Sequence, residues 1–104
     1  MSRMLGGLMQ KAQEMKSKVQ EAREDLKNQQ VTAESEDGKI KVVSNCDKGL
    51  ISISIDDSLL TDRSALEEVL LKTTNDALSK AGEVQKETAQ KAMKDAGLFL
   101  PGMF

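Results

Sequence analysis

The sequence contains no histidine, tryptophan or tyrosine, and it has a single cysteine and a single proline. Without histidine, Ser-His-Asp and Cys-His nucleophilic sites and His-ligated metal sites are excluded. One cysteine, Cys46, excludes an intrachain disulfide and a cysteine-rich zinc site, and it is typical of a protein from a reducing cytosol. We therefore expect no catalytic site, no metal site and no cofactor.

Long apolar runs are also absent. No stretch approaches the roughly 20 apolar residues that a transmembrane helix needs, and Met1–Leu8 lacks the continuous apolar region of a secretory signal. Leu5-Gly6-Gly7-Leu8 lacks the lysine and the spacing of a phosphate-binding P-loop. These absences predict a soluble cytoplasmic protein with no membrane partner and no small-molecule substrate.

Two polar features could suggest chemistry, but each has a simpler explanation. Asp56, Asp57 and Asp62 could form a metal or acid–base site, yet they lack the spacing of a calcium loop, and helix capping accounts for them. Cys46 lies in a polar turn, where we expect a partly exposed thiol of ordinary reactivity.

The length and composition predict a single domain over residues 1–104 with a modest core. The only aromatic residues are Phe99 and Phe104, so the core must consist of aliphatic side chains and methionine.

Charge is unevenly distributed along the sequence. Residues 1–30 carry six basic and four acidic residues, residues 31–71 carry four and nine, and residues 72–104 carry five and four. Any surface that binds nucleic acid is therefore expected on the terminal segments.

Two segments have the pattern of long helices. The spacing of apolar residues predicts a helix over about 4–28 with a narrow heptad stripe, and that stripe requires a second helix to cover it. Its members are Leu5, Leu8, Ala12, Met15, Val19, Ala22 and Leu26. A second helix is predicted over about 63–96, opened by a capping box of Ser64 and Glu67 and closed at Ala96-Gly97. An apolar tail, 97–104, follows.

The segment between the helices, about 31–56, predicts three antiparallel strands. Asp37-Gly38 is a strong hairpin signal, and Asn45–Gly49 reads as a second turn. Ile51, Ile53 and Ile55 alternate with serine, so one face of the last strand is apolar and is expected to pack on helices. The predicted class is α+β in the order α-β-β-β-α.

Four motifs, in order, resemble the YbaB/EbfC family of nucleoid-associated proteins. They are Leu8-Met9-Gln10-Lys11-Ala12-Gln13-Glu14-Met15, Ile53-Ser54-Ile55-Asp56, the segment from Leu70 to Ala81 with its Asn-Asp-Ala core, and the closing Gly97–Phe104 with its Pro-Gly pair. The sequence departs from the family pattern in two turns. Ser35-Glu36-Asp37-Gly38 keeps one glycine of the usual cluster, and Asp57 stands where the family usually has proline.

The resemblance implies a tweezer-like homodimer whose long helices project as arms. It implies binding of double-stranded DNA with little sequence preference, in the nucleoid, with a role in nucleoid organisation and gene regulation. The alternative that the apolar helical stripe leaves open is a homodimeric adaptor or chaperone-like module that docks a client helix in its groove.

The candidate DNA contacts are lysines and arginines on the two helices, since phosphate binding is driven by counterion release. On the first helix they are Lys11, Lys16, Lys18, Arg23 and Lys27, with Arg3 before them. Lys16, Arg23 and Lys27 share one band of the helix, because spacings of seven and four return to nearly the same face. On the second helix Lys80, Lys91 and Lys94 form a weaker group near Lys86. The simpler interpretation is that these residues only solvate exposed helix faces.

Overall fold

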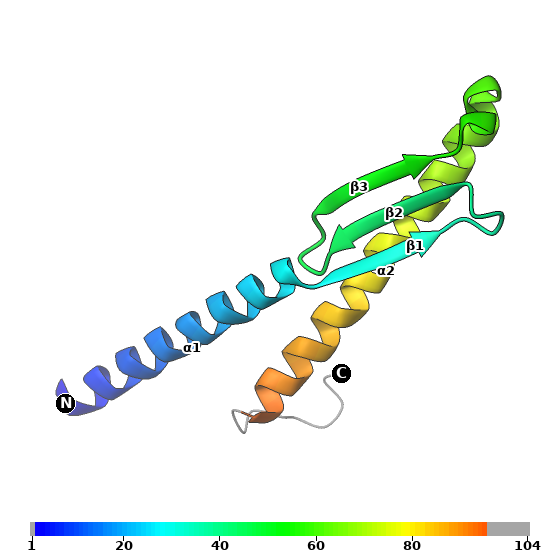
Figure 1. Cartoon of the computed structure of the whole chain (residues 1–104). Helices are drawn as coiled ribbons and strands as arrows, with labels where there is room; N and C mark the ends of the chain where they lie inside the picture. Colours follow the sequence, from blue (N-terminus) through cyan, green and yellow to red (C-terminus); the bar gives the residue numbers. More distant parts are fainter. Residues whose placement is uncertain (1, 96–104) are drawn as a thin grey trace.

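The computed structural model describes residues 2–95, with the side chains of residues 5–94, and shows two long helices joined by a small sheet (Figure 1). The elements, in order, are α1 (Ser2–Asn28), β1 (Gln30–Glu34), β2 (Ile40–Asn45), β3 (Leu50–Ile55), a 3-10 helix η1 (Asp57–Thr61) and α2 (Arg63–Asp95). The predicted α+β class and element order are confirmed. The expected C-cap at Ala96-Gly97, the tail 97–104 and the side chain of Arg3 lie outside the described residues.

The three strands form an antiparallel sheet in the order β1-β2-β3. At the first turn Gly38 has a φ of 72°, which explains why glycine is required there. The Ser35 hydroxyl donates to Asp37 Oδ1 at 2.7 Å and the Ile40 amide donates to the Ser35 hydroxyl at 3.0 Å, so this turn is held by side chains. The predicted hairpin at Asp37-Gly38 is therefore confirmed.

Helix α2 covers one face of the sheet and builds the core against β1 and β2. Ile40 and Val42 of β2 are fully buried, and they meet Ala77 of α2, which is also fully buried. Because alanine has a small side chain, the helix backbone can lie close to the sheet. The Thr73 hydroxyl, also buried on this face, donates to the Val69 carbonyl at 2.8 Å. The buried residues Thr73, Ala77 and Ala81 thus recur every four residues on the face of α2 that meets the sheet.

The expectation that the apolar face of β3 packs on helices is only partly met. Ile55 contacts the core, but Ile51 is 49% exposed and Ile53 is 44% exposed. Ile53 shares the face that α2 covers, since it pairs with the buried Val42, whereas Ile51 lies at an irregularity of the β2–β3 register. A helix with its side chains is about 10 Å wide, whereas three strands span nearly as much between their axes alone, so one helix over β1 and β2 leaves the β3 edge open.

The expected capping box at the start of α2 is wrong. The Asp62 carboxylate accepts the Ala65 amide at 3.2 Å, so Asp62 and not Ser64 caps the helix. Glu67 does not reach back to the helix start, because its carboxylate binds Arg63 Nε at 2.9 Å. Asp56 caps η1 by accepting the Ser58 amide, as the capping interpretation of the acidic residues predicted.

The expectation of a partly exposed Cys46 is also wrong, because its side chain is 1% exposed. The β2–β3 turn folds under the end of α1, where the Cys46 amide donates to the carbonyl oxygens of Leu26 and Gln29, both at 2.9 Å. The bond to Leu26 satisfies a carbonyl in the last turn of α1, where a helix leaves carbonyls without an intrahelical partner, and Gln29 lies directly after the helix. The turn that carries Cys46 therefore serves as the C-terminal cap of α1.

The molecule is elongated, with extents of 70 × 26 × 18 Å. Its radius of gyration is 19.7 Å, whereas a globular chain of about 100 residues has about 13 Å. The length comes from α1, which leaves the sheet at its base and diverges from α2 (Figure 1). Leu5 and Leu8 on the free half of α1 are each more than 60% exposed. The predicted apolar stripe is therefore present, but within the described residues only its last turns are covered.

Candidate nucleic-acid interface

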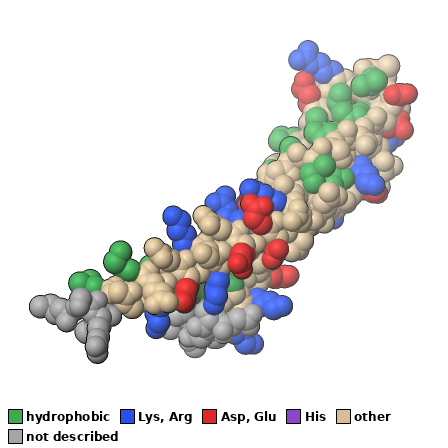
Figure 2. Space-filling view, turned by 60° about the vertical axis from the view of Figure 1, so that its left-hand side comes forward, with side chains coloured by type: hydrophobic (Ala, Val, Ile, Leu, Met, Phe, Trp, Pro, Cys, Tyr) green, Lys and Arg blue, Asp and Glu red, His purple; other side chains and the backbone are tan. Residues whose placement is uncertain are grey.

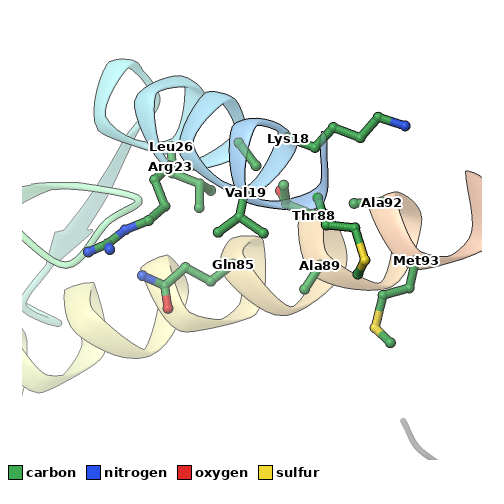
Figure 3. A pocket seen from close by; sticks show the side chains of 11 residues that line it. Lys18, Val19, Arg23, Leu26, Gln85, Thr88, Ala89, Ala92 and Met93 are labelled. Carbon is green, nitrogen blue, oxygen red and sulfur yellow. The ribbon is translucent and has the colours of Figure 1, made fainter. Parts of the chain in front are cut away.

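The basic side chains of α1 lie along both rims of its apolar stripe. Lys18 and Arg23 line opposite sides of the groove that this stripe forms with α2 (Figure 3). Lys11 lies two turns before Lys18 on the same rim, and Lys16 lies two turns before Arg23 on the other. All four are exposed. Any partner that lies against the inner side of α1 therefore meets lysine or arginine on either side of an apolar floor.

The acidic residues of α1 lie on a different side of the helix. Glu21, Glu24 and Asp25 line a hollow on the outer surface together with Ser17 and Gln20, and Arg23 and Lys27 of the neighbouring rim also reach it. Helical spacing places Glu14, two turns before Glu21, on that same outer face. The helix is thus divided lengthwise, with cations beside the stripe and anions behind it, although its net charge is small. Figure 2 shows lysine and arginine along the upper edge of the elongated arm, with acidic side chains below them and further basic side chains on the lower edge.

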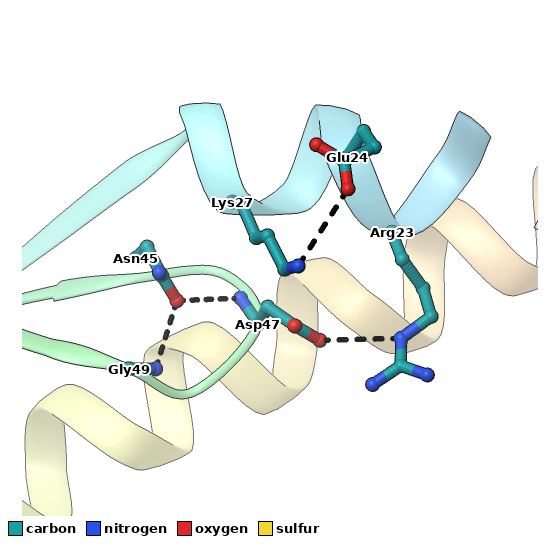
Figure 4. Close-up of polar contacts among 6 residues, drawn as sticks. All are labelled: Arg23, Glu24, Lys27, Asn45, Asp47 and Gly49. Atoms are coloured by element: carbon teal, nitrogen blue, oxygen red, sulfur yellow. Dashed lines mark hydrogen bonds and ion pairs between the residues drawn. The ribbon is translucent and has the colours of Figure 1, made fainter. Parts of the chain in front are cut away.

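Two members of the predicted basic band are engaged by carboxylates. Arg23 Nε lies 3.9 Å from Asp47 Oδ1, and Lys27 Nζ lies 3.6 Å from Glu24 Oε1 (Figure 4). The Arg23 and Lys27 side chains remain 67% and 51% exposed, so both stay accessible to a phosphate. Within the described residues, Lys11, Lys16 and Lys18 make no ion pair. Three of the five predicted α1 cations are therefore unneutralised by acidic side chains of the described chain.

The β2–β3 turn positions the Asp47 carboxylate. Asn45 Oδ1 accepts the amides of Asp47 at 3.0 Å and Gly49 at 2.8 Å, which fixes the turn around one side chain (Figure 4). A Cβ at Gly49 would lie 2.9 Å from the Asn45 side-chain nitrogen, so any other residue there would displace the Asn45 amide. The turn is thus held in a shape that presents Asp47 to α1.

Sequence analysis did not select Lys48, which the same turn brings to the junction of α1 and α2. Lys48 has a φ of 61°, and its side-chain stem lies over Gly82 of α2, with Lys48 Cε 3.5 Å from where a Cβ on Gly82 would stand. Lys86 is one helical turn beyond Gly82, on the same face. No local pattern distinguishes Lys48 from any lysine in a turn, so only the packing of the turn on α2 reveals it.

The predicted basic residues of α2 are separated in the structure. Lys80 Nζ donates to the Thr32 carbonyl oxygen at 2.8 Å, which ties α2 to the outer side of β1. Lys91 and Lys94 are exposed near the free end of α2, and Lys94 lies in the last turn, where a cation also favours the helix dipole. Lys80 is therefore partly structural, whereas Lys91 and Lys94 remain candidate phosphate ligands.

Negative charge is concentrated at the other end of the molecule. A hollow between the β1–β2 hairpin and α2 is lined by five acidic residues and one lysine, Lys72, whose Nζ lies 3.6 Å from Glu36 Oε1. The acidic residues are Glu34, Glu36, Asp37, Glu68 and Asp76. This acidic end of the sheet repels a polyanion and leaves the arms as the surface that can approach one.

The described residues offer little support for other chemistry. They contain no group of three or more histidine, cysteine, aspartate or glutamate residues that could hold a metal. Burial raises the pKa of the Cys46 thiol, which disfavours its reactive thiolate form. In the same part of the chain, none of the helices has the length and apolar character needed to cross a membrane.

Comparison with known proteins indicates DNA binding, as the distribution of charge does. Residues 1–96 match the YbaB/EbfC DNA-binding family. The chain belongs to this family. A nucleoid-associated protein from Akkermansia muciniphila is 40% identical over 98 residues, which cover 90% of each chain. The YbaB/EbfC resemblance seen in four short motifs is therefore confirmed over nearly the whole sequence.

The fold agrees with this membership. The crystal structure of an uncharacterized protein from Helicobacter pylori has a TM-score of 0.70 to this chain at 30% sequence identity. The alignment covers 86% of this chain and 92% of that one. The arrangement of two long helices on a three-stranded sheet is thus found in a second, experimentally determined structure.

Proposed function

We propose that this member of the YbaB/EbfC family coats double-stranded DNA as a homodimer with little sequence preference and contributes in this way to nucleoid organisation and gene regulation. The observation that carries the proposal is the division of α1 into a basic inner side and an acidic outer face. Lys11, Lys16 and Lys18 supply cations that make no ion pair with the described part of the chain, and Arg23 and Lys27 supply accessible ones. Such contacts address phosphates, which carry no sequence information.

The homodimer is supported by apolar surface that residues 2–95 leave exposed. Ile51 and Ile53 are exposed at the β3 edge, and Leu60 of η1 is 64% exposed nearby in the sequence. A small chain that exposes large aliphatic side chains on an edge strand gains stability by covering them with a second copy. In the dimer the number of α1 arms doubles, and two basic inner sides can face one duplex.

Affinity is expected to depend strongly on salt. The net charge of −2 gives no long-range attraction, so binding depends on the local cations of the arms. The logarithm of the binding constant falls with the logarithm of salt concentration by about 0.9 for each neutralised phosphate. Because each subunit makes few phosphate contacts, a single dimer is expected to bind weakly. Many dimers bound along one duplex would together coat it.

The test is a fluorescence-anisotropy titration of a random duplex at low and physiological salt. Glutamate replaces Lys16, Arg23 and Lys27 together in the test variant. In the matched control, glutamate replaces Lys39, Lys41 and Lys72, three lysines nearer the acidic end of the sheet, so that the net charge changes equally. Loss of binding in the test variant, with binding kept in the control variant, supports the proposal. Equal effects in both variants, or no binding by the parent at low salt, would contradict it.

A further inference from the structure

An apolar groove lies in the angle between α1 and α2 and has a volume of about 360 Å³ (Figure 3). Its α1 wall includes Met15, Val19 and Leu26, and its α2 wall includes Ala89, Ala92 and Met93. Val19 is 58% exposed although it points into this concave surface. Large aliphatic side chains that line a groove without being covered mark a surface that binds another apolar group.

The segment that follows α2 is apolar and therefore suited to occupy this groove. Helix α2 ends at Asp95, two residues after Met93 in the groove wall. The segment Leu98–Phe104 contains no charged residue, and it holds both phenylalanines of the chain together with Leu98, Leu100 and Met103. We propose that Leu98–Phe104 of the same chain lies in the groove between α1 and α2 and covers its apolar floor.

The segment is long enough to reach the whole α2 wall. From Asp95 back to Gln85, the far end of that wall, a helix rises about 15 Å. The nine residues 96–104 can span up to about 30 Å when extended. Gly97, directly before the segment, permits the reversal of direction that the return path requires. Chain length and starting point therefore both favour the chain's own segment over a distant one.

The proposed contact between Leu98–Phe104 and the groove uses apolar side chains, whereas DNA binding uses charged ones. The floor of the groove is apolar, whereas the charged side chains at its edges, Lys18 and Arg23, lie on opposite rims. The uncharged side chains of this segment fit the floor without desolvating a charged side chain, and the rims stay open to phosphates. The proposal therefore goes beyond DNA binding and does not depend on it.

Disulfide trapping tests the contact. Leu100→Cys is combined with Ala89→Cys, in the groove wall, or with Lys91→Cys as the matched control. Ala89 and Lys91 are both exposed and are two residues apart on different faces of α2. We expect the Ala89 pair to form an intrachain disulfide at least about tenfold faster, because docking raises the effective thiol concentration.

Two results would overturn the proposal. Equal rates for the two pairs would mean that the segment does not dock in the groove. Disulfides formed between chains by the Ala89 pair would mean that the segment of a second copy occupies it. Cys46 is present in both proteins and is buried, so its contribution is small and cancels in the comparison.

Fluorescence supplies a second measurement that needs no cysteine. Because the chain has no tryptophan or tyrosine, Phe99→Trp introduces a single reporter. We expect blue-shifted emission and protection from acrylamide, both lost when Ala89→Glu is added and both kept with Lys91→Glu. Solvent-like emission in the Phe99→Trp protein itself, with an unchanged circular dichroism spectrum, would contradict docking.

Discussion

Arg23 Nε lies 3.9 Å from Asp47 Oδ1, and this contact links the last turns of α1 to the β2–β3 turn. Only the Nε of the guanidinium makes the contact, and the Arg23 side chain is largely exposed, so we expect it to contribute about 1 kcal/mol or less to stability. Its consequence concerns binding, because Asp47 competes with phosphate for one of the cations on the rim of the arm.

Asp47→Asn tests this competition. Removing the negative charge is expected to strengthen duplex binding by up to about fivefold, which corresponds to about 1 kcal/mol. The free energy of unfolding changes little, since Asn45 continues to hold the turn through the backbone amides. Affinity is measured by fluorescence anisotropy. Asp25→Asn makes the same change of charge on the outer face of α1, and an equal gain there would show that general charge, not the Arg23 contact, is responsible.

Ile53→Asp tests the proposed dimer surface. Covering an isoleucine of each subunit stabilises a dimer by about 1.5–3 kcal/mol per side chain, so the variant is expected to dissociate at least about a hundredfold more readily. Light scattering measures the mass, and circular dichroism checks the fold. Ser54→Asp is the control, because Ser54 lies on the other face of the same strand and pairs with Lys41. A mass unchanged by Ile53→Asp would place the dimer interface elsewhere.

The β1–β2 hairpin is expected to depend on pH through Asp37. The hydroxyl of Ser35 and the backbone amide of Lys39 hold the pKa of Asp37 below its ordinary value of 3.8. A lowered folded-state pKa means that these bonds stabilise the fold fully above pH 3.8, and that this stabilisation is lost as the pH falls through the folded-state pKa.

Ser35→Ala is therefore expected to raise the pKa of Asp37 towards 3.8, as measured by NMR titration of the carboxyl carbon. Asp56 provides an internal control. The Ser58 backbone amide and hydroxyl lower its pKa, so this value is expected to change little. A pKa of Asp37 that does not move in the variant would show that the Ser35 hydroxyl does not bind the carboxylate in solution.

Cys46 is expected to resist thiol reagents in the folded protein. Its side chain is buried and its pKa is raised by burial, so reaction requires local opening of the β2–β3 turn. Opening that costs about 3 kcal/mol slows labelling by more than about a hundredfold relative to the unfolded chain. Lys91→Cys supplies an exposed thiol for comparison. Comparable labelling rates for the two thiols in the folded protein would contradict the burial of Cys46.

Much of the fold follows from the sequence because its signals are local. The apolar spacing from Leu5 to Leu26 predicted α1, and the alternation at Ile51, Ile53 and Ile55 predicted β3. Asp37-Gly38 predicted the hairpin, and the structure shows each of these elements. The capping box failed because Asp62 and Ser64 are both good capping residues, and the choice between them depends on the path of the chain out of η1.

The candidate site was predictable only in part. Helical spacing predicts that Lys16 and Arg23 lie along one side of α1, since angular position depends on sequence separation alone. It could not show that Asp47 approaches Arg23, that Lys80 binds the Thr32 carbonyl, or that Lys48 crosses to Gly82. These contacts join residues far apart along the chain or depend on a turn that contains no periodic pattern.

The sequence by itself determined the elements, their order, the apolar stripes and the division of charge along α1, because periods of 3.6 and 2 residues are properties of the local backbone. Only the tertiary structure decided which of those stripes are covered. One helix is too narrow to cover three strands, so α2 buries Val42 and leaves Ile53 open. The same packing buries Cys46 beneath α1 and turns Val19 into the wall of a groove, because burial depends on what lies across from a side chain in space.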